Sequence, residues 1–350
     1  MPQRKIHLDI LRILACFFVI VNHFDFGFFN YTNLPAGSIS YWVSLFISVF
    51  CKFSVPLFFM ISGALLLRKE ESIKDLYENR VFKMVTSLFI ASFIYFVFEK
   101  YIIKSDIAFS KIYTNEMLYH LWYIYAYIAY LMLLPFLRII AKRLNESLFQ
   151  YMLSIFIFIV AIIPTLELLF FNNAYHVNYS LTYTPLAINI FVMPLVGYYV
   201  EHILDIKKYR NTKRMVLLLC VNFSCILLSM YCSYVDPACR QGVSQTYINC
   251  FSAINAMTIY IYVKTYYANI DTPSYAEKAL RYSVCTFGIY VLHMIPMRLI
   301  LINEQLREMY GQISFALQLI VWIGVSLVIF FIAYIFVRAL HKNKTLAKYL

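Results

Sequence analysis

Two ionisable side chains, Arg12 and His23, lie eleven positions apart in an otherwise apolar run near the N-terminus. Eleven helical steps of about 100° make three turns plus about 20°, so both side chains leave the same face of a helix. They are separated by about 16 Å along its axis. An imidazole accepts and returns protons near neutral pH, and a guanidinium stabilises negative charge. The pair therefore has the residue types for proton transfer beside a developing anion.

Further polar side chains interrupt the first two apolar segments. Asp9 shares the helical face of Arg12, and it either pairs with that residue or complements the helix dipole as a first-turn acid. Lys52 lies near the middle of the second segment, too deep to reach the interface, so it must face a partner or a wet cavity. An ion pair that holds two helices together is the alternative. Ser62 and Gly63 follow near the end of that segment, where a glycine permits close approach of two backbones.

Two histidines and a tryptophan stand out in the later apolar segments. His120 and Trp122 lie near the outer end of the fourth segment, where a tryptophan commonly marks the membrane interface. His293, in the ninth segment, lies at a depth comparable with that of His23, so we expect these two histidines to line one cavity. The structural alternative for an intramembrane histidine is a buried ring that bonds a neighbouring carbonyl.

The composition requires lipid as the solvent of this chain. Hydrophobic residues make up 62% of it and charged residues 14%, against about 25% charged residues in a soluble domain. Ten apolar segments approach the roughly 20 residues that cross a bilayer. We therefore predict an all-α integral membrane protein, a bundle of about ten transmembrane helices that forms a single membrane-embedded domain over residues 1–350. The predicted spans are 8–29, 39–67, 81–103, 118–140, 149–171, 184–203, 213–235, 246–267, 281–302 and 314–338.

The net charge of +12 is mostly an orientation signal. With the N-terminus in the cytoplasm, 22 of the 30 Lys and Arg residues fall on the cytoplasmic side of the predicted spans and six on the other side. This positive-inside distribution places both termini in the cytoplasm. It also accounts for the basic charge without a nucleic-acid partner. Arg80 and Lys83, at the start of the third span, are either part of this signal or an anion site.

The first apolar run is too long for a cleavable signal peptide, and no small-residue cleavage site follows it. We therefore expect it to remain as the first span of a multi-pass protein of the cell membrane, of the bacterial inner-membrane type. The eight cysteines lack metal-ligand spacing and are expected to be small buried hydrophobes, and we expect no metal. Cys239 and Cys250 flank one predicted outer loop, so a disulfide between them is the alternative.

Four stretches of the chain carry a family resemblance. The first is a Leu-Asp, Arg and His pattern in the first span, formed by Leu8, Asp9, Arg12 and His23. The others, in chain order, are VPLFFMISG at 55–63, which follows Lys52, then HLWYI at 120–124 and IYVLH at 289–293. Together these stretches resemble the integral-membrane acyltransferase-3 family over nearly the whole chain.

The resemblance implies an O-acetyltransferase that moves an acetyl group from cytosolic acetyl-CoA to a hydroxyl of a glycan or lipid-linked sugar at the membrane. His23 is then the general base, and Arg12 is its catalytic partner. The residues expected to bind the acyl-CoA are Arg80, Lys83, Lys52 and Ser62. The residues expected to bind the acceptor are His293, His120 and Trp122.

The chain departs from the family pattern after the second span. The family often carries R-x-x-R there, whereas this chain has Arg80 and Lys83 at the two basic positions. The lysine retains the charge but lacks the planar fork of a second guanidinium. The prolines that commonly follow are absent. We expect the stand-alone form of the family, without a hydrolase-like domain after the membrane part.

A secondary transporter or a flippase of a lipid-linked sugar is the alternative function. Such proteins also have about ten spans, kinked helices and intramembrane charge, but the sequence shows no inverted repeat. An inactive relative that acts as a scaffold is a third hypothesis, and the intact pair of Arg12 and His23 argues against it. Release of the CoA thiol distinguishes the enzyme from both.

Overall fold

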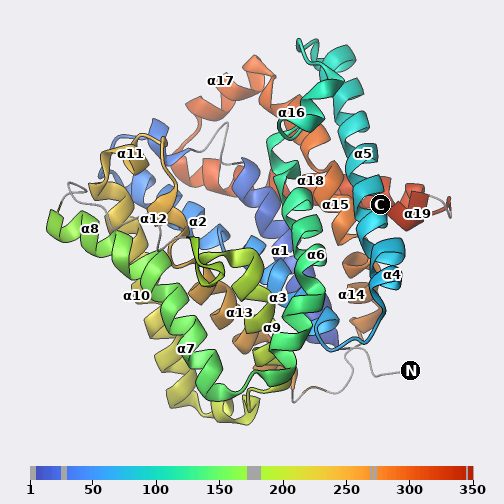
Figure 1. Ribbon diagram of the computed structural model, residues 1–350. Coiled ribbons are helices and arrows are strands. Elements are labelled where there is room, and N and C mark those ends of the chain that lie inside the picture. The colour runs from blue at the N-terminus through green and yellow to red at the C-terminus, as the bar shows by residue number, and fades with distance from the viewer. Residues whose placement is uncertain are drawn as a thin grey trace. The chain divides into compact units, whose positions relative to one another are not determined.

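The computed structural model describes residues 5–24, 30–171, 183–268, 270, 274–343 and 346–349. Helices make up all of the regular secondary structure in these ranges (Figure 1). The chain divides into two compact units, the first formed by Met1–Arg68 and Leu137–Leu280, the second by Lys69–Phe136 and Arg281–Leu350. The predicted single membrane-embedded domain covers both units, and it stays a prediction.

The first unit begins with the N-terminal helix and contains the longer central part of the chain. Its α-helices are α1 Ile6–Phe24, α2 Ile39–Cys51, α3 Ser54–Leu66, α7 Glu146–Ile157, α8 Ile163–Phe171, α9 Asn189–His202, α10 Thr212–Val235, α11 Pro237–Arg240, α12 Thr246–Asn249 and α13 Ser252–Tyr267. Its 3₁₀ turns are η1 Tyr31–Asn33, η8 Pro185–Ala187 and η9 Ile206–Arg210, and its π-helical stretch is η6 Phe158–Ile162.

The second unit contains the C-terminal helices and the segment after α3. Its α-helices are α4 Ile73–Leu76, α5 Phe82–Val97, α15 Thr286–Leu292, α16 Met294–Leu301, α17 Glu304–Gln312, α18 Phe315–Leu340 and α19 Leu346–Tyr349. Its π-helical stretches are η2 Tyr77–Val81 and η3 Phe98–Ile103, and its 3₁₀ turns are η4 Phe109–Tyr113 and η5 Tyr119–Leu121. Residues of both units occur in α6 Trp122–Arg143 and α14 Ala276–Ser283.

The structure confirms an all-α membrane protein but has fewer full-length spans than predicted. The described residues contain seven helices long and apolar enough to cross a membrane, and an eighth candidate bent by 44° between α14 and α15. The predicted spans 184–203 and 246–267 contain only α9, of 14 residues, and α13, of 16 residues. These helices rise about 21 and 24 Å, whereas the hydrocarbon core is about 30 Å thick. The described residues thus contain seven or eight full-length candidates where about ten were predicted, because apolar composition continues through segments whose helices are short.

Two glycines bring α3 and α9 into backbone contact. A Cβ atom at Gly63 would overlap the carbonyl of Pro194, and one at Gly197 would overlap the carbonyl of Met60. Small residues commonly occupy such crossings between membrane helices, since they let two backbones approach. The close approach predicted for Gly63 is confirmed, and its partner helix is α9.

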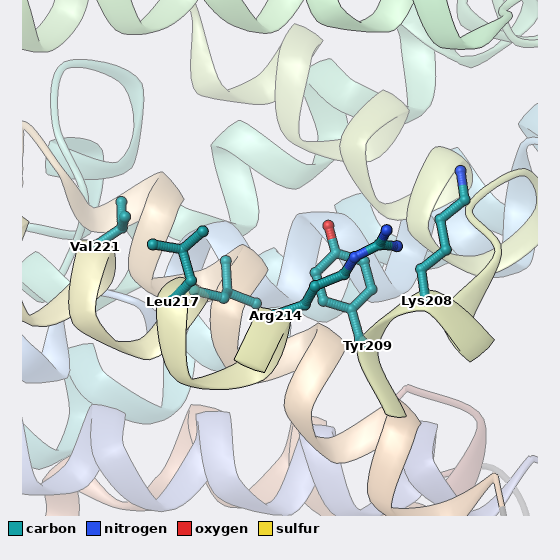
Figure 2. A pocket seen from close by; sticks show the side chains of 6 residues that line it. Lys208, Tyr209, Arg214, Leu217 and Val221 are labelled. Atoms are coloured by element: carbon teal, nitrogen blue, oxygen red, sulfur yellow. The ribbon is translucent and has the colours of Figure 1, made fainter. Parts of the chain in front are cut away.

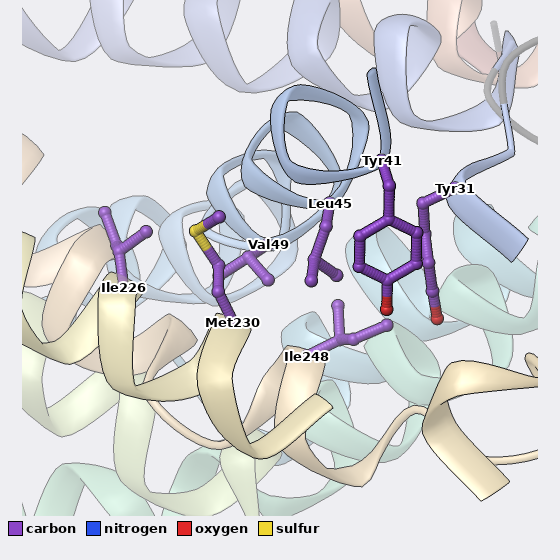
Figure 3. Packing of buried hydrophobic residues seen from close by; sticks show 7 residues of the cluster. All are labelled: Tyr31, Tyr41, Leu45, Val49, Ile226, Met230 and Ile248. Atoms are coloured by element: carbon purple, nitrogen blue, oxygen red, sulfur yellow. The ribbon is translucent and has the colours of Figure 1, made fainter. Parts of the chain in front are cut away.

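The N-terminal part of α10 is mostly exposed, and its buried residues begin at Asn222, from where it is packed against neighbouring helices. Side chains from η9 and the start of α10 line a pocket (Figure 2). Further along, α10 packs against α2 and α12 through a buried apolar cluster (Figure 3). The members of this cluster are Tyr31, Tyr41, Leu45, Val49, Ile226, Met230 and Ile248.

The eight cysteines are all free thiols, as expected of small apolar side chains. Cys232 and Cys239 pack with Leu168 and Tyr247 in one buried cluster. The alternative of a disulfide between Cys239 and Cys250 is therefore wrong in this structure. Cys250 instead donates its thiol hydrogen to the carbonyl of Tyr247 at 3.2 Å.

Candidate active site

Arg12 pairs with Asp9 on α1, as their shared face allows. The Arg12 Nη1 atom lies 3.5 Å from the Asp9 Oδ1 atom, and the side chains are 29% and 5% exposed. A carboxylate that is this deeply buried requires a charged partner, and the guanidinium three positions along the helix supplies it. The structure therefore favours the partner role of Asp9 and fixes the direction of the Arg12 side chain.

His23 lies in the last turn of α1 and is half-buried. The helix runs without interruption from Ile6 to Phe24, so the separation of about 16 Å between Arg12 and His23 holds along its axis. His23 thus lies at the end of the helix that carries Arg12, and it is less buried than the neighbouring Phe24.

A buried carboxylate that the sequence prediction missed anchors the other end of α1. Glu201, on α9, has a side chain only 1% exposed. It accepts hydrogen bonds from Lys5 Nζ at 2.5 Å and from Tyr260 Oη at 3.0 Å, and His7 Nε2 lies 3.0 Å away. Lys264 Nζ is 3.7 Å from the same carboxylate. The network ties the start of α1 to α9 and α13. An acid inside the predicted span 184–203 was the available signal.

Lys52 lies at the break between α2 and α3, where it follows the last residue of α2. Its Nζ atom donates to the Oε1 atom of Gln245 at 3.1 Å. Ser62 is half-buried on α3, next to the glycine that contacts α9. The donor-binding roles predicted for Lys52 and Ser62 stay predictions.

Two basic residues hold the C-terminal end of α3. Arg138, on α6, donates from Nε to the carbonyl of Leu66 at 3.1 Å, and His202 Nε2 lies 2.8 Å from the carbonyl of Ala64. The last carbonyls of a helix have no partners within it, so basic side chains commonly satisfy them. The sequence placed Arg138 among the orientation charges, but it is also buried and structural.

The second unit contains a pair of histidines that sequence reasoning had not paired with each other. His120 and His293 are fully buried, and their ring centroids lie 5.2 Å apart at an interplanar angle of 78°. His120 Nε2 bonds the carbonyl of Val291 at 3.2 Å, and His293 Nδ1 bonds the carbonyl of Tyr290 at 2.6 Å. Because a carbonyl oxygen only accepts, both ring nitrogens donate. Each ring is thereby oriented by a main-chain group.

Tyrosines complete the surroundings of this histidine pair. Tyr95 donates its hydroxyl to the carbonyl of Val291 at 2.5 Å, and Tyr290 donates its hydroxyl to the carbonyl of His120. The ring centroid of Tyr95 lies 5.0 Å from that of His120. Trp122, at the start of α6, is 45% exposed and thus differs from the two histidines with which it was grouped.

A second ion pair that the sequence analysis missed lies nearby in the second unit. Arg298 donates from Nε and Nη2 to the two carboxylate oxygens of Glu99 at 2.9 and 3.1 Å. This two-pronged geometry is the strongest that the two groups form. Arg298 is one of the six basic residues on the outer side of the predicted spans, and the acid within the predicted third span was again the available signal for a partner.

Arg80 lies in the π-helical stretch η2 and is held by an acid nine residues earlier. Its Nε atom donates to the carboxylate oxygens of Glu71 at 2.9 and 3.1 Å. Lys83 follows on α5 and is half-buried. Stretches of π-helix frequently occur at functional sites. Any anion that binds Arg80 must therefore share the guanidinium with Glu71.

The predicted site residues are divided between the two units. The first unit holds Arg12, His23, Lys52 and Ser62, and the second holds Arg80, Lys83, His120, Trp122 and His293. The structure brings together Arg12 with Asp9, and His120 with His293. The cavity predicted between His23 and His293 stays a prediction.

Comparison with known proteins identifies the family. The family model of the acyltransferase domain of the acyltransferase-3 family matches residues 6–340, nearly the whole chain. No curated protein and no solved structure matches the chain. The matched range includes most of both units and every candidate site residue. This multi-pass membrane protein therefore belongs to the acyltransferase-3 family and is an acyltransferase.

Proposed function

We propose that this acyltransferase moves an acetyl group from acetyl-CoA to a hydroxyl of a glycan or lipid-linked sugar at the cell membrane. The observation that carries the proposal is the arrangement on α1. Arg12 is oriented by a buried acid, and a half-buried His23 follows on the same helix about 16 Å away. Charged and titratable groups are costly inside a membrane, so their presence on one face supports a chemical role.

In the proposed reaction His23 is the general base. It takes the proton of the acceptor hydroxyl while the oxygen attacks the thioester carbonyl, which forms the new C–O bond. The tetrahedral intermediate then collapses with cleavage of the C–S bond, and the leaving CoA thiolate takes the proton from the imidazolium. The products are the acetyl ester and the CoA thiol, and His23 is returned to its neutral form. A transient acetyl-histidine is the covalent variant of the same scheme.

The negative charge of the tetrahedral intermediate requires nearby donors. Lys52 and main-chain donors at small residues are the groups of the first unit proposed for this task, since fixed positive charge in a site that excludes water stabilises an oxyanion by several kcal/mol. Arg12 lies about 16 Å from His23 along α1, a separation comparable with the reach of a pantetheine arm, and is proposed to hold the donor on the cytoplasmic side of the reacting thioester. Asp9 orients the Arg12 guanidinium before the substrate arrives. Such orientation avoids reorganisation during the reaction.

The remaining predicted residues are proposed to bind the substrates. Arg80 and Lys83 have the charge for the phosphates of the CoA nucleotide, for which a guanidinium is especially suited. Ser62 is proposed to contact the same donor. His120, Trp122 and His293 are proposed to contact the acceptor, and for the two histidines this requires an opening of their buried surroundings.

The proposal is tested with purified protein in liposomes that is given acetyl-CoA and cell-envelope glycan extract. Wild-type protein should release CoA thiol and label a glycan with acetyl. His23→Ala should lose both signals, whereas Asn22→Ala, in the same turn of α1, should keep them. Full turnover by His23→Ala would overturn the general-base assignment. Movement of a lipid-linked sugar across the liposome without thiol release would instead support the transporter or flippase.

The acceptor is identified in cells. Mass spectrometry of envelope glycans with and without the gene should show the loss of one acetyl group from one glycan. Unchanged glycan acetylation, together with acetylation of a small metabolite, would contradict a glycan acceptor and leave the chemistry on α1 intact.

A further inference from the structure

The segment before α10 carries the densest group of cations in the chain. Residues 207–214 read KKYRNTKR, with five Lys or Arg residues in eight positions. This segment leads directly into a 24-residue helix that is apolar enough to cross the membrane. Clusters of basic residues immediately beside a span attract the acidic lipids of the adjacent leaflet. The cluster therefore has a second interpretation besides orientation.

Two of these cations line a pocket of about 450 Å³. Lys208 and Tyr209 come from η9, and Arg214 comes from the first turn of α10. Figure 2 shows the ammonium, hydroxyl and guanidinium groups of these three side chains directed to the same side of the pocket. Among the described residues, no carboxylate pairs with Lys208 or Arg214. The pocket thus has one cationic end whose charge no carboxylate of the described residues compensates.

The other end of the pocket is aliphatic. Leu217, Leu218 and Val221 follow Arg214 at three, four and seven positions, so all four residues lie on one face of α10. From Arg214 to Val221 the helix rises about 10 Å. Leu217 is 65% exposed on this membrane-spanning helix, which is the surface that acyl chains cover. The pocket therefore joins a cationic end at the start of the span to a lipid-facing apolar stripe.

We propose that this pocket binds an anionic glycerophospholipid. Its phosphate lies between Lys208 and Arg214, Tyr209 donates a hydrogen bond to it, and one acyl chain follows the stripe of α10. Charge complementarity selects an acidic lipid over a zwitterionic one, since two cations face the headgroup without a protein anion between them. The aliphatic end selects a lipid over a soluble phosphate, which would leave that surface without a partner.

The test measures lipid binding to the full-length protein in a neutral detergent by native mass spectrometry and by thermal unfolding. Phosphatidylglycerol should bind and raise the unfolding temperature, and phosphatidylcholine should do neither. Lys208→Ala/Arg214→Ala should weaken phosphatidylglycerol binding at least tenfold, because each basic residue near an acidic lipid contributes about a factor of five. All residues of the pocket lie at the surface or half-buried, so the variant should fold.

A matched control uses cations of the same cluster that do not line the pocket. Lys207→Ala/Lys213→Ala removes the same charge and should leave phosphatidylglycerol binding within about threefold of wild type. An equal loss in both double variants would overturn the site in favour of diffuse attraction. Equal binding of phosphatidylcholine and phosphatidylglycerol would also overturn it.

Two further arms separate the lipid from other phosphates and test its acyl chain. Inorganic phosphate and acetyl-CoA, added at the same concentration, should not displace the lipid, and displacement by acetyl-CoA would reassign the pocket to the donor. Dihexanoyl phosphatidylglycerol should bind more weakly than the dioleoyl lipid, because it covers less of the α10 stripe. Equal affinity of the two lipids would contradict contact between the stripe and the chain.

Discussion

The histidines of the two units are held in different ways. His23 ends a helix of the first unit, is half-buried, and shares a face with an oriented guanidinium. His120 and His293 in the second unit are fully buried, and each donates a ring hydrogen to a main-chain carbonyl. A histidine ring that exchanges protons with a substrate must keep part of its surface accessible. A fully buried ring that donates to a main-chain carbonyl holds the local structure in place. Burial therefore separates the three histidines, although their sequence contexts made all of them candidates.

The supports around these histidines also differ. The first unit fixes α1 through the buried carboxylate of Glu201 and crosses α3 with α9 through paired glycines. The second unit surrounds His120 and His293 with tyrosines and holds α16 through the ion pair of Glu99 and Arg298. The first unit thus combines rigid backbone contacts with an accessible imidazole, which is the combination that a catalytic group requires.

The largest effect is expected at the glycine crossing of the first unit. Gly63→Ala should prevent stable folding or cost about 3 kcal/mol or more, because its methyl group meets the Pro194 carbonyl on α9. Gly324→Ala on α18 of the second unit is the matched control, since a Cβ atom there has no neighbour within 4 Å. It should leave stability equal or raise it by up to about 1 kcal/mol. Thermal unfolding of both variants in detergent measures the difference, and equal unfolding temperatures would contradict the backbone contact.

The next effect is on turnover and separates the histidines directly. His23→Ala should lower kcat by about 10²- to 10⁴-fold, the usual contribution of a general base, without lowering the unfolding temperature. Acetyl transfer to the envelope glycan measures it, with Asn22→Ala as the folded control. If His23→Ala keeps its turnover and His293→Ala loses it, the general base must be sought at His293 in the second unit rather than at His23 in the first.

The anchor of α1 should contribute to stability more than to chemistry. Glu201→Gln leaves Lys5, His7 and Lys264 without their buried carboxylate, and it should cost about 3 kcal/mol. This loss of stability is at the lower end of the range for breaking a buried ion pair, because the Lys5 side chain is partly exposed. Glu304→Gln, at an exposed helix start in the second unit, should change stability by less than about 1 kcal/mol.

Contrary results for the anchor would be informative about α1. A Glu201→Gln protein with normal unfolding and reduced kcat would show that the network positions the face of α1 that is proposed to carry the chemistry, rather than stabilising the unit. Normal values of both would mean that the buried carboxylate is dispensable in either role.

The buried histidine of the second unit should affect stability modestly. His293→Ala removes a ring packed against His120 and bonded to Tyr290, which should cost about 2 kcal/mol. The kcat of the folded fraction should stay within about tenfold of wild type. Trp122→Ala should be nearly neutral for stability, since this side chain is 45% exposed. The KM of His293→Ala for the acceptor should also rise, since His293 is proposed to contact it, and an unchanged KM would contradict that contact.

Local features of the chain were predictable, and its long-range partners were not. The periodicity of the first span places Asp9 beside Arg12, and the structure confirms that contact. A glycine in an apolar segment predicts a close backbone approach but not that Gly197 is its counterpart. The partners of Glu201 lie 59 to 196 positions away, and no spacing rule relates them. Periodicity describes one helix at a time, whereas partner choice depends on how the helices pack.

The exact number of spans was beyond the sequence for the same reason: the described residues contain seven or eight full-length candidates where about ten were predicted. Hydropathy detects apolar composition over a window and not where a helix ends, and α9 and α13 lie in two of the apolar segments that were predicted as spans. Their helices are nevertheless short, because flanking residues form a 3₁₀ turn or a separate short helix. The family resemblance, in contrast, rested on four motifs in a fixed order, and the match over residues 6–340 confirms it.

The smallest expected effect is at Arg80, where the second unit is proposed to meet the nucleotide of the donor. Glu71 occupies the Arg80 guanidinium and competes with a phosphate for it. Glu71→Gln should therefore lower the KM for acetyl-CoA by up to about fivefold. The ion pair of Glu71 and Arg80 is partly exposed and contributes at most about 1 kcal/mol, which corresponds to a change of that size. Arg80→Ala should raise the same KM, and kcat should change little in either variant.

The control for this last effect is an acid of the same segment with a different partner. Glu78 lies 3.9 Å from Lys74, and both side chains are exposed, so Glu78→Gln should leave the KM for acetyl-CoA unchanged. Initial rates measured over a range of acetyl-CoA concentrations compare the three variants. A rise in KM for Glu71→Gln would mean that the carboxylate orients Arg80 toward the donor rather than competing with it. If neither the Arg80 nor the Glu71 variant alters the KM for acetyl-CoA, the proposal that the nucleotide of the donor binds at Arg80 is wrong. The chemistry assigned to α1 would then need a donor site elsewhere in the chain.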